Sequence, residues 1–396
     1  MLRYTPGVGF SDGTFGRPFR IFNGGTGYTG NPGRTDCRIR KVARMRRIAF
    51  FALLAGMVSP CLAQARTLPI ERGERACTSC RSLDLAINGF GVSFGNSTRF
   101  TGLRFNLVDR DVEEIKGINL TFWKPRENPN AVIRGITLGL VAPEADRIEG
   151  ISAGAVAVVG GSGISGISAA GLAVVSDGGI AGMAFGGLAT VAEGGAGGLV
   201  AGGLASVIDG RMTGACIGGL ASVVEGSMTG LSFGGLASVT EGGFSGISFG
   251  GLASVIEGPT AGISLGGLAS VTEGGLSGIS AGGLASVVEG DVVGVMAAGL
   301  ACVTDQRLSG FGAAGCTVRS GEISGAALAG AYVKAHELSG FSAATVNYFD
   351  EYQVGLSIGI VNIAERLNGI QLGIINIARN NSPPFKVLPL INAHFE

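Results

Sequence analysis

The chain has 396 residues, of which 72 are glycine and 46% are hydrophobic. Glycine is well above its usual share of ~7%, but a mean hydropathy of +0.43 supplies too much apolar surface for a disordered chain. The formal net charge is zero, yet residues 66–396 hold 19 basic and 27 acidic residues. This excess of acid excludes the basic face that a nucleic-acid-binding protein needs.

The N-terminal region resembles an export signal. Six Lys or Arg residues between positions 38 and 47 precede the apolar run Ile48–Val58, and Ala63-Gln64-Ala65 follows. A basic segment, a short apolar segment and an A-x-A site predict a signal peptide over residues 45–65. The apolar run is too short to span a bilayer, so no transmembrane helix is expected beyond this peptide.

The signal peptide also suggests where the protein begins. Met45 directly precedes the last two arginines, so residues 1–44 are interpreted as an overcalled start or as a disordered extension. We expect an exported protein at the cell surface, in the outer membrane or in the periplasm of a bacterium. Lipidation at Cys61 stays open, because Pro60 fits a lipoprotein signal poorly.

A polar leader, residues 66–84, follows the signal peptide and contains Cys77-Thr78-Ser79-Cys80. Its spacing is that of a redox motif, but no strand and helix flank it. A local disulfide between Cys77 and Cys80 is the preferred interpretation for an oxidising compartment, and a redox or metal role is the alternative.

A repeat array is predicted over residues 85–380. From Gly150 to Gly310, glycine recurs every sixteen residues without slippage, and the spacing tightens to 15 and then 14 towards Gly369. One unit reads G-I-S-F-G-G-L-A-S-V-I-E-G-P-T-A from Gly246. Counting from Gly89, the array holds about nineteen units. Such a fixed period indicates a stacked repeat protein.

Each unit is predicted to be β structure. Apolar residues alternate with small or polar ones, which is the period of a strand. The acid-glycine step near position 12 is a turn signal, and the paired glycines in the middle of the unit allow a sharp corner. Small residues at the other positions suit a narrow interior. Lys124–Asn130 is expected to form a loop outside the stack.

Two architectures fit this pattern. The preferred one is a parallel β-solenoid of about nineteen short coils, because units that are alike one by one favour parallel, in-register stacking. Asn347, Asn362 and Asn376 would then form a ladder. The alternative is an antiparallel β-barrel or meander, in which each unit is one strand and a turn.

An acidic residue recurs at one position of the unit. In a solenoid these side chains would form a column with like charges roughly 4.8 Å apart, which destabilises a sheet unless the carboxylates reach water or bind cations. A solvated turn is the preferred interpretation. Calcium is the one cofactor considered, since it takes several oxygen ligands. The column is Asp177, Glu193, Asp209, Glu225, Glu241, Glu257, Glu273, Glu289 and Asp305.

No catalytic residues are predicted. The two histidines, His336 and His394, lie in no recognisable triad motif. The glycine-rich steps precede no helix, which a phosphate-binding loop requires. Three further cysteines, Cys216, Cys302 and Cys316, replace small or apolar residues of the repeat and are expected to be buried.

The C-terminal end resembles bacterial surface repeat-containing proteins. The similarity lies in Gly369-Ile-Gln-Leu-Gly-Ile-Ile-Asn-Ile-Ala and in the segment that follows it, where residues 381–396 are expected to cap the array. The resemblance implies export and a β-repeat fold, and it brings no activity. The sequence therefore predicts an exported, non-enzymatic surface or outer-membrane-associated protein with a structural, adhesive or binding role. Its partners would be cell-surface or extracellular macromolecules. An outer-membrane β-barrel or pore is the alternative.

Overall fold

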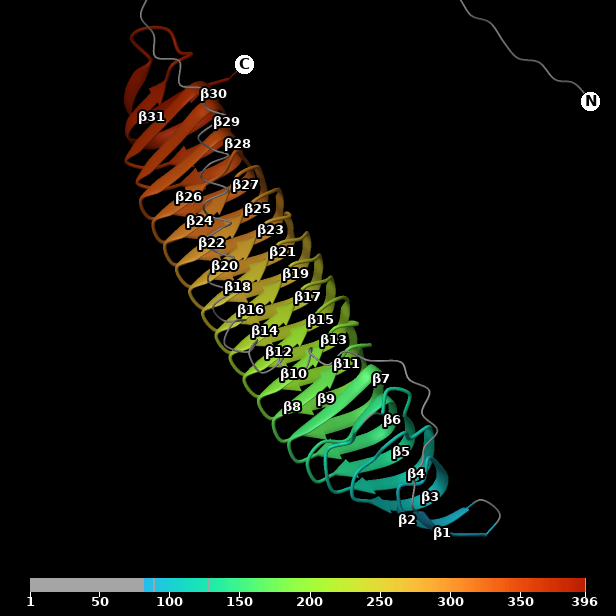
Figure 1. The fold of residues 1–396 in the computed structure, drawn as a ribbon. Helices are drawn as coiled ribbons and strands as arrows, with labels where there is room; N and C mark the ends of the chain where they lie inside the picture. The colour runs from blue at the N-terminus through green and yellow to red at the C-terminus, as the bar shows by residue number, and fades with distance from the viewer. Residues whose placement is uncertain (1–81, 88–89, 127, 396) are drawn as a thin grey trace, which may run out of the picture. The chain divides into compact units, whose positions relative to one another are not determined.

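The computed structural model describes residues 82–87, 90–126 and 128–395. The chain divides into two compact units, Met1–Arg75 and Ala76–Glu396, and all the described residues belong to the second. They form strands β1 to β31 and no helix, so none of them makes a helix that would cross a membrane. The unit is a parallel β-solenoid of about 17 turns (Figure 1).

A coil of the regular array has two strands and two corners. One strand is long and one is short, and they build the two sheets of the solenoid. The long strands are β9 Ile180–Gly186, β11 Ala196–Gly202, β13 Met212–Gly218, β15 Met228–Gly234, β17 Phe244–Gly250, β19 Thr260–Gly266, β21 Leu276–Gly282, β23 Val292–Ala298, β25 Arg307–Ala314 and β27 Glu322–Ala329. The short strands are β8 Ala173–Ser176, β10 Ala189–Ala192, β12 Ala205–Ile208, β14 Ala221–Val224, β16 Ala237–Thr240, β18 Ala253–Ile256, β20 Ala269–Thr272, β22 Ala285–Val288, β24 Ala301–Thr304 and β26 Thr317–Arg319.

The ends of the unit are built differently. Strands β3 to β5 are followed by loops, and the longer strands bend from one sheet into the other. The N-terminal strands are β1 Ser82–Ile87, β2 Phe90–Gly95, β3 Arg99–Asn106, β4 Glu114–Thr121, β5 Val132–Gly139, β6 Glu144–Gly154 and β7 Ala157–Ala170. The C-terminal strands are β28 Tyr332–Ala343, β29 Val346–Ile358, β30 Val361–Ala378 and β31 Val387–His394. The described residues of the predicted loop, 124–126 and 128–130, lie between β4 and β5, outside the strands.

Neighbouring coils pair in parallel and in register. β17 pairs with β19 so that Gly246 lies beside Gly262, and β18 pairs with β20 in the same way. Antiparallel pairing within the described residues occurs only at β1–β2 and β30–β31. The prediction of a parallel β-solenoid is therefore confirmed and the antiparallel alternative is wrong, but the solenoid has about 17 turns and not the predicted nineteen. The glycine column starts at Gly91, which pairs with Gly102, and not at Gly89.

The glycine column is required by the backbone. Gly246 has a φ of +137°, and a Cβ on it would lie 1.9 Å from the carbonyl oxygen of Gly230 in the preceding coil. At the corner, a Cβ on Gly250 would lie 1.8 Å from the carbonyl oxygen of Ala253. The positive φ together with the close approach restricts the Gly246 position to glycine, whereas alanine replaces the corner glycine at Ala298 and Ala314. The sixteen-residue glycine period is thus the direct trace of coil stacking.

The interior holds small side chains such as serine beside larger apolar ones. Phe244 and Ile256 are buried, and Ser248 is fully buried between them in the coil. Ile247 and Phe249 alternate with these residues and point outward, where they are 45% and 37% exposed. The apolar residues at positions 2 and 4 of the unit therefore lie on the outer surface.

Serine hydroxyls form a chain along the middle of the interior. Nine fully buried serines from the two sheets alternate along the stack, and successive Oγ atoms lie 2.7–3.1 Å apart. Each hydroxyl can donate one bond and accept another, so the chain satisfies groups that would otherwise be costly to bury. The members are Ser222, Ser232, Ser238, Ser248, Ser254, Ser264, Ser270, Ser280 and Ser286.

The asparagine ladder is confirmed at the C-terminal end. Asn347 donates through Nδ2 to Oδ1 of Asn362 at 2.8 Å, and Asn362 donates to Oδ1 of Asn376 at 2.7 Å. The ladder continues the same interior column that holds Ser254 and Ser286 in the middle of the array. β31 then pairs antiparallel with β30 and covers the last coil.

Candidate interaction surface

The acidic column lies at one corner of the coil, after each short strand. All its members are exposed except Glu273, which is half-buried. Burial raises the pKa of Glu241 above its ordinary value, and the neighbouring charges of Glu257, Glu225 and Asp209 raise it further. The like charges therefore interact along the stack, as predicted. The described residues contain no cluster of three His, Cys, Asp or Glu side chains that would hold a metal, and calcium binding stays a prediction.

The cysteines have three different outcomes. Cys77 and Cys80 lie outside the described residues, so their disulfide stays a prediction. Cys216 and Cys302 are buried, as predicted, and burial raises the pKa of each thiol to about 11. The prediction for Cys316 is wrong, because this residue is exposed. Cys316 follows Gly315 at the corner where earlier coils carry an outward leucine.

The two histidines are not brought together. His336 lies on β28, where its Nδ1 is 3.3 Å from a carboxylate oxygen of Asp350 and its side chain is 61% exposed. His394 lies on β31, and its Nδ1 is 2.6 Å from Oδ1 of Asn381. Neither contact includes a serine or cysteine, so neither has the arrangement of a nucleophilic triad.

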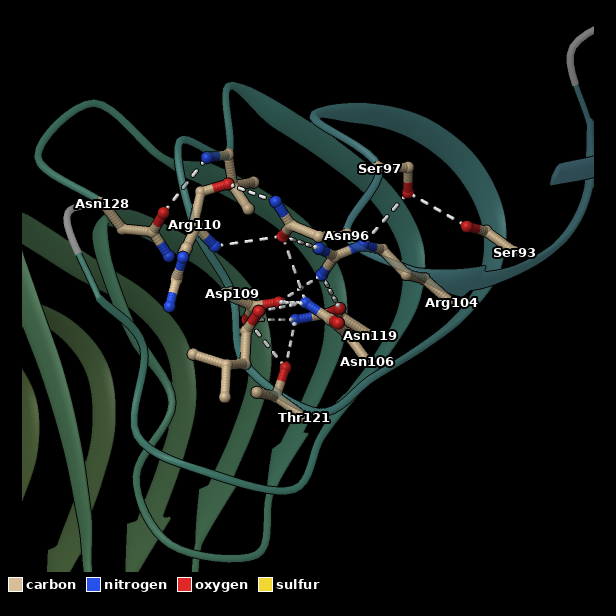
Figure 2. A network of polar contacts seen from close by, with 12 residues as sticks. Ser93, Asn96, Ser97, Arg104, Asn106, Asp109, Arg110, Asn119, Thr121 and Asn128 are labelled. Carbon is tan, nitrogen blue, oxygen red and sulfur yellow. Dashed lines mark hydrogen bonds and ion pairs between the residues drawn. The ribbon is translucent and has the colours of Figure 1, made fainter. Parts of the chain in front are cut away.

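A buried charged network fills the N-terminal coils (Figure 2). Arg104 on β3 is fully buried, and Asp109 in the loop that follows is 2% exposed. Arg104 donates to Asp109, to Oδ1 of Asn119 at 2.8 Å and to Oδ1 of Asn96 at 3.1 Å. Asp109 also accepts from the Thr121 hydroxyl at 2.7 Å. Sequence reasoning missed this site, since a single Arg in a strand carries no motif.

The network is closed and satisfied by the chain's own groups. Asn106 donates to Asp109 at 2.8 Å, and Ser97 accepts from Nε of Arg104 at 3.2 Å. Arg104 takes the place that Ser152 and Ser168 hold in the same interior column further along. The buried ion pair is thus hydrogen-bonded within the chain, and the network fills the interior of the N-terminal coils.

Charge in the regular array is confined to one edge. Residues 151–305 contain ten acidic residues and one basic residue, Arg211. All eleven lie in or beside the corners that follow the short strands, such as Asp209, Glu257 and Asp291. The two sheets and the opposite corner therefore present uncharged surface over about ten coils.

The opposite corner carries a column of leucines. Each member follows the corner glycine, and all are 46–49% exposed. An exposed apolar column of this length is unusual, because soluble monomers rarely expose large contiguous apolar patches. The leucine column consists of Leu172, Leu188, Leu204, Leu220, Leu236, Leu252, Leu268, Leu284 and Leu300.

A second apolar column runs beside it on the sheet of long strands, and its side chains protrude to different heights. Phe233 and Phe249 stack with ring centroids 5.2 Å apart and protrude. Beyond Leu265 the same column continues as three alanines, which help to line an open apolar hollow of about 740 Å³. We call Phe233 and Phe249 the knob, and Ala281, Ala297 and Ala313 the hollow. In register, this outer column is Ala153, Ala169, Phe185, Ala201, Ile217, Phe233, Phe249, Leu265, Ala281, Ala297, Ala313, Leu328 and Ala343.

The sequence carries a signal for this change in side-chain size along the outer column. At position 4 of the unit the residue type changes from aromatic, at Phe233 and Phe249, to alanine, at Ala281 and Ala297. The signal is informative only once the direction of the side chain is known, because an inward column of this kind would only alter core packing.

Comparison with family models, with curated proteins and with solved structures found no match for this chain. The resemblance to bacterial surface repeat-containing proteins therefore stays a prediction based on the closing repeats.

Proposed function

We propose that the chain is an exported, non-enzymatic repeat protein of the bacterial surface or outer membrane, with a structural or binding role. The observation that carries the proposal is the uncharged apolar surface of the array, with its leucine column at 46–49% exposure. Apolar surface on this scale marks an interaction site in a soluble protein. Repetition at every coil gives such a surface many equivalent contacts, which favours multivalent binding.

Export is supported by the sequence alone. The basic segment, the apolar run Ile48–Val58 and Ala63-Gln64-Ala65 form the pattern of a signal peptide. The test is fractionation of bacteria that express the full chain, followed by protease treatment of intact cells. We expect the chain in the envelope fraction, shortened at its N-terminus and cleaved by added protease.

A matched pair of variants makes the export test specific. Leu53→Arg with Leu54→Arg interrupts the apolar run and should leave the chain unprocessed in the cytoplasm. Leu83→Arg changes the charge outside the predicted signal, at an exposed side chain, and should have no effect. Unprocessed wild-type chain in the cytoplasm would contradict the proposal.

A further inference from the structure

The outer column has a shape that is complementary to itself. The knob protrudes in the coils of β15 and β17, and the hollow lies in the coils of β21, β23 and β25, with Leu265 between them. We propose that this face binds a second copy of the chain, antiparallel, with the knob of each copy seated in the hollow of the other. The inference goes beyond the proposed function and does not depend on export.

The order of knob and hollow along the column fixes the orientation. A two-fold axis perpendicular to the stack and close to Leu265 brings each knob onto the partner's hollow, so both contacts form together. This is the self-complementary interface of a closed dimer. A parallel arrangement would instead place Phe249 on the partner's Phe249 and leave both hollows empty.

The spacing of the coils allows the side chains to interdigitate. Both copies repeat at ~4.8 Å, the distance between neighbouring strands, so a residue of one column fits between two residues of the other. With the knob centred on the hollow, Phe249 lies between the partner's Ala281 and Ala297. The two stacked rings, which are already held parallel with an interplanar angle of 7°, enter an open depression of about 740 Å³ whose lining runs from Phe249 through the hollow to Ala343.

The distribution of charge favours a second copy over a membrane. The acidic edge is at the other corner of each coil, so pairing through the outer column keeps the two rows of carboxylates apart. Amphipathic surfaces that bind membranes usually carry Lys or Arg beside the apolar face. In residues 151–305 the array offers only Arg211, and its carboxylates would be repelled by anionic lipids.

The available area is that of a specific interface. The outer column and the neighbouring leucine column run side by side over the regular array. Covering both over nine coils removes on the order of 800 Å² from water per copy, which is the area of a standard stable interface. Phe233 and Phe249 are the expected hot spots, because large aromatic residues seated in a pocket contribute most of the binding energy.

The test uses sedimentation of the chain as it is purified from the expressing cell. The knobless variant, Phe233→Ala with Phe249→Ala, should weaken self-association by roughly 30-fold or more. The filled variant, Ala281→Phe with Ala297→Phe, should weaken it similarly. Trp123→Ala removes an exposed aromatic side chain from a distant loop and should change nothing. All the substituted side chains point outward, and circular dichroism checks that each variant keeps its β structure.

Mixing the two variants gives the decisive result. The knobless chain keeps its hollow and accepts the filled chain's knob, while its missing knob no longer clashes with the filled hollow. An equimolar mixture should therefore form heterodimers at concentrations where each variant alone associates only weakly. Combining all four substitutions in one chain should restore the homodimer. This four-substitution chain replaces either double variant in the test if that variant fails to fold.

Three outcomes would overturn the proposal. The first is a wild-type chain that stays monomeric at high micromolar concentration. The second is self-association that neither variant weakens. The third is a monomer that floats with phosphatidylcholine vesicles, together with loss of flotation in the knobless variant, which would make the face a lipid-binding surface. None of these outcomes depends on whether the chain is exported.

Discussion

The middle coils and the N-terminal coils share one backbone design but fill their interior with different chemistry. In the middle, Ser248 and its equivalents form a neutral hydroxyl chain that repeats with every coil. At the N-terminal end the same column holds Arg104, paired with Asp109. The comparison shows two ways to bury polar groups: the middle serines bond to serines of the repeat itself, whereas Arg104 is bonded by side chains of other types, such as Asp109 and Asn119.

Of the substitutions compared, the one at the ion pair should lower the free energy of unfolding most. Asp109→Leu leaves the Arg104 guanidinium buried without its counter-charge, so we expect the N-terminal coils to lose about 3–5 kcal/mol of stability. Hydrogen exchange should show the loss in β3, β4 and β5 and not in the middle of the array. Glu113→Gln removes an exposed partner of Arg99 and is the control, expected to cost under ~1 kcal/mol. Equal exchange in the two variants would show that the network does not stabilise this end.

In the middle coils, a substitution in the glycine column should lower the stability most. Gly246→Ala places a Cβ 1.9 Å from a carbonyl oxygen at a φ of +137°, so the coil must open at an expected cost of about 3 kcal/mol. Gly197→Ala is the matched control, because its Cβ would meet nothing within 4 Å. Thermal unfolding should separate the two variants clearly. If they melt together, the column does not hold the coils in contact.

A substitution in the serine chain should lower the stability less than one at the ion pair or in the glycine column. Ser248→Ala removes hydrogen bonds to Ser238 and Ser254, but each of these serines keeps a second partner. We expect a loss of about 1 kcal/mol. Asn362→Ala should cost more, about 2 kcal/mol, because it removes the amide that donates to the buried Oδ1 of Asn376. Chemical denaturation gives both values, and the reverse order would contradict this account of the interior.

The smallest effect on stability is expected in the acidic column. The raised pKa of Glu241 means that the folded state binds a proton more readily than the unfolded state. Its contribution is therefore most favourable below its ordinary pKa of 4.5 and is lost as the pH rises through the raised pKa. Because the side chain is exposed, Glu241→Gln should stabilise the chain at pH 7 by only a few tenths of a kcal/mol. Added salt should reduce this gain, and a loss of stability in the variant would show that the column is held by cations.

Much of the fold could be predicted from the sequence. The glycine spacing indicated the coil, the likeness of successive units indicated parallel stacking, and Asn347 and Asn362 indicated a ladder. The exceptions lie where a residue's role depends on direction or on distant partners. Cys316 is exposed because its position belongs to the leucine corner, and Arg104 is buried because loop residues such as Asp109 and Asn96 fold back over it.

The candidate surface was the least predictable part. Alternation along a strand separates two faces but does not say which one is inside. A core would normally take the larger apolar residues, whereas Ile247 and Phe249 lie outside and Ser248 lies inside. Both faces of the strand carry apolar residues, since Phe244 is buried on the same side as Ser248, so the pattern alone does not identify the inner face. The knob and the hollow exist as surface features only because the face that carries Phe249 points outward.

The central claim is that the outer column of one copy seats in that of another. Disulfide formation between Phe249→Cys and Ala297→Cys, both introduced in a chain that also carries Cys316→Ser, tests it directly. Within one chain these positions are three coils apart, roughly 14 Å at the strand spacing, which is too far for a disulfide. We predict a covalent dimer whose linked peptides contain positions 249 and 297, and no such dimer for either cysteine alone. Absence of the 249–297 link under oxidising conditions, in a chain that keeps its fold, would contradict the claim.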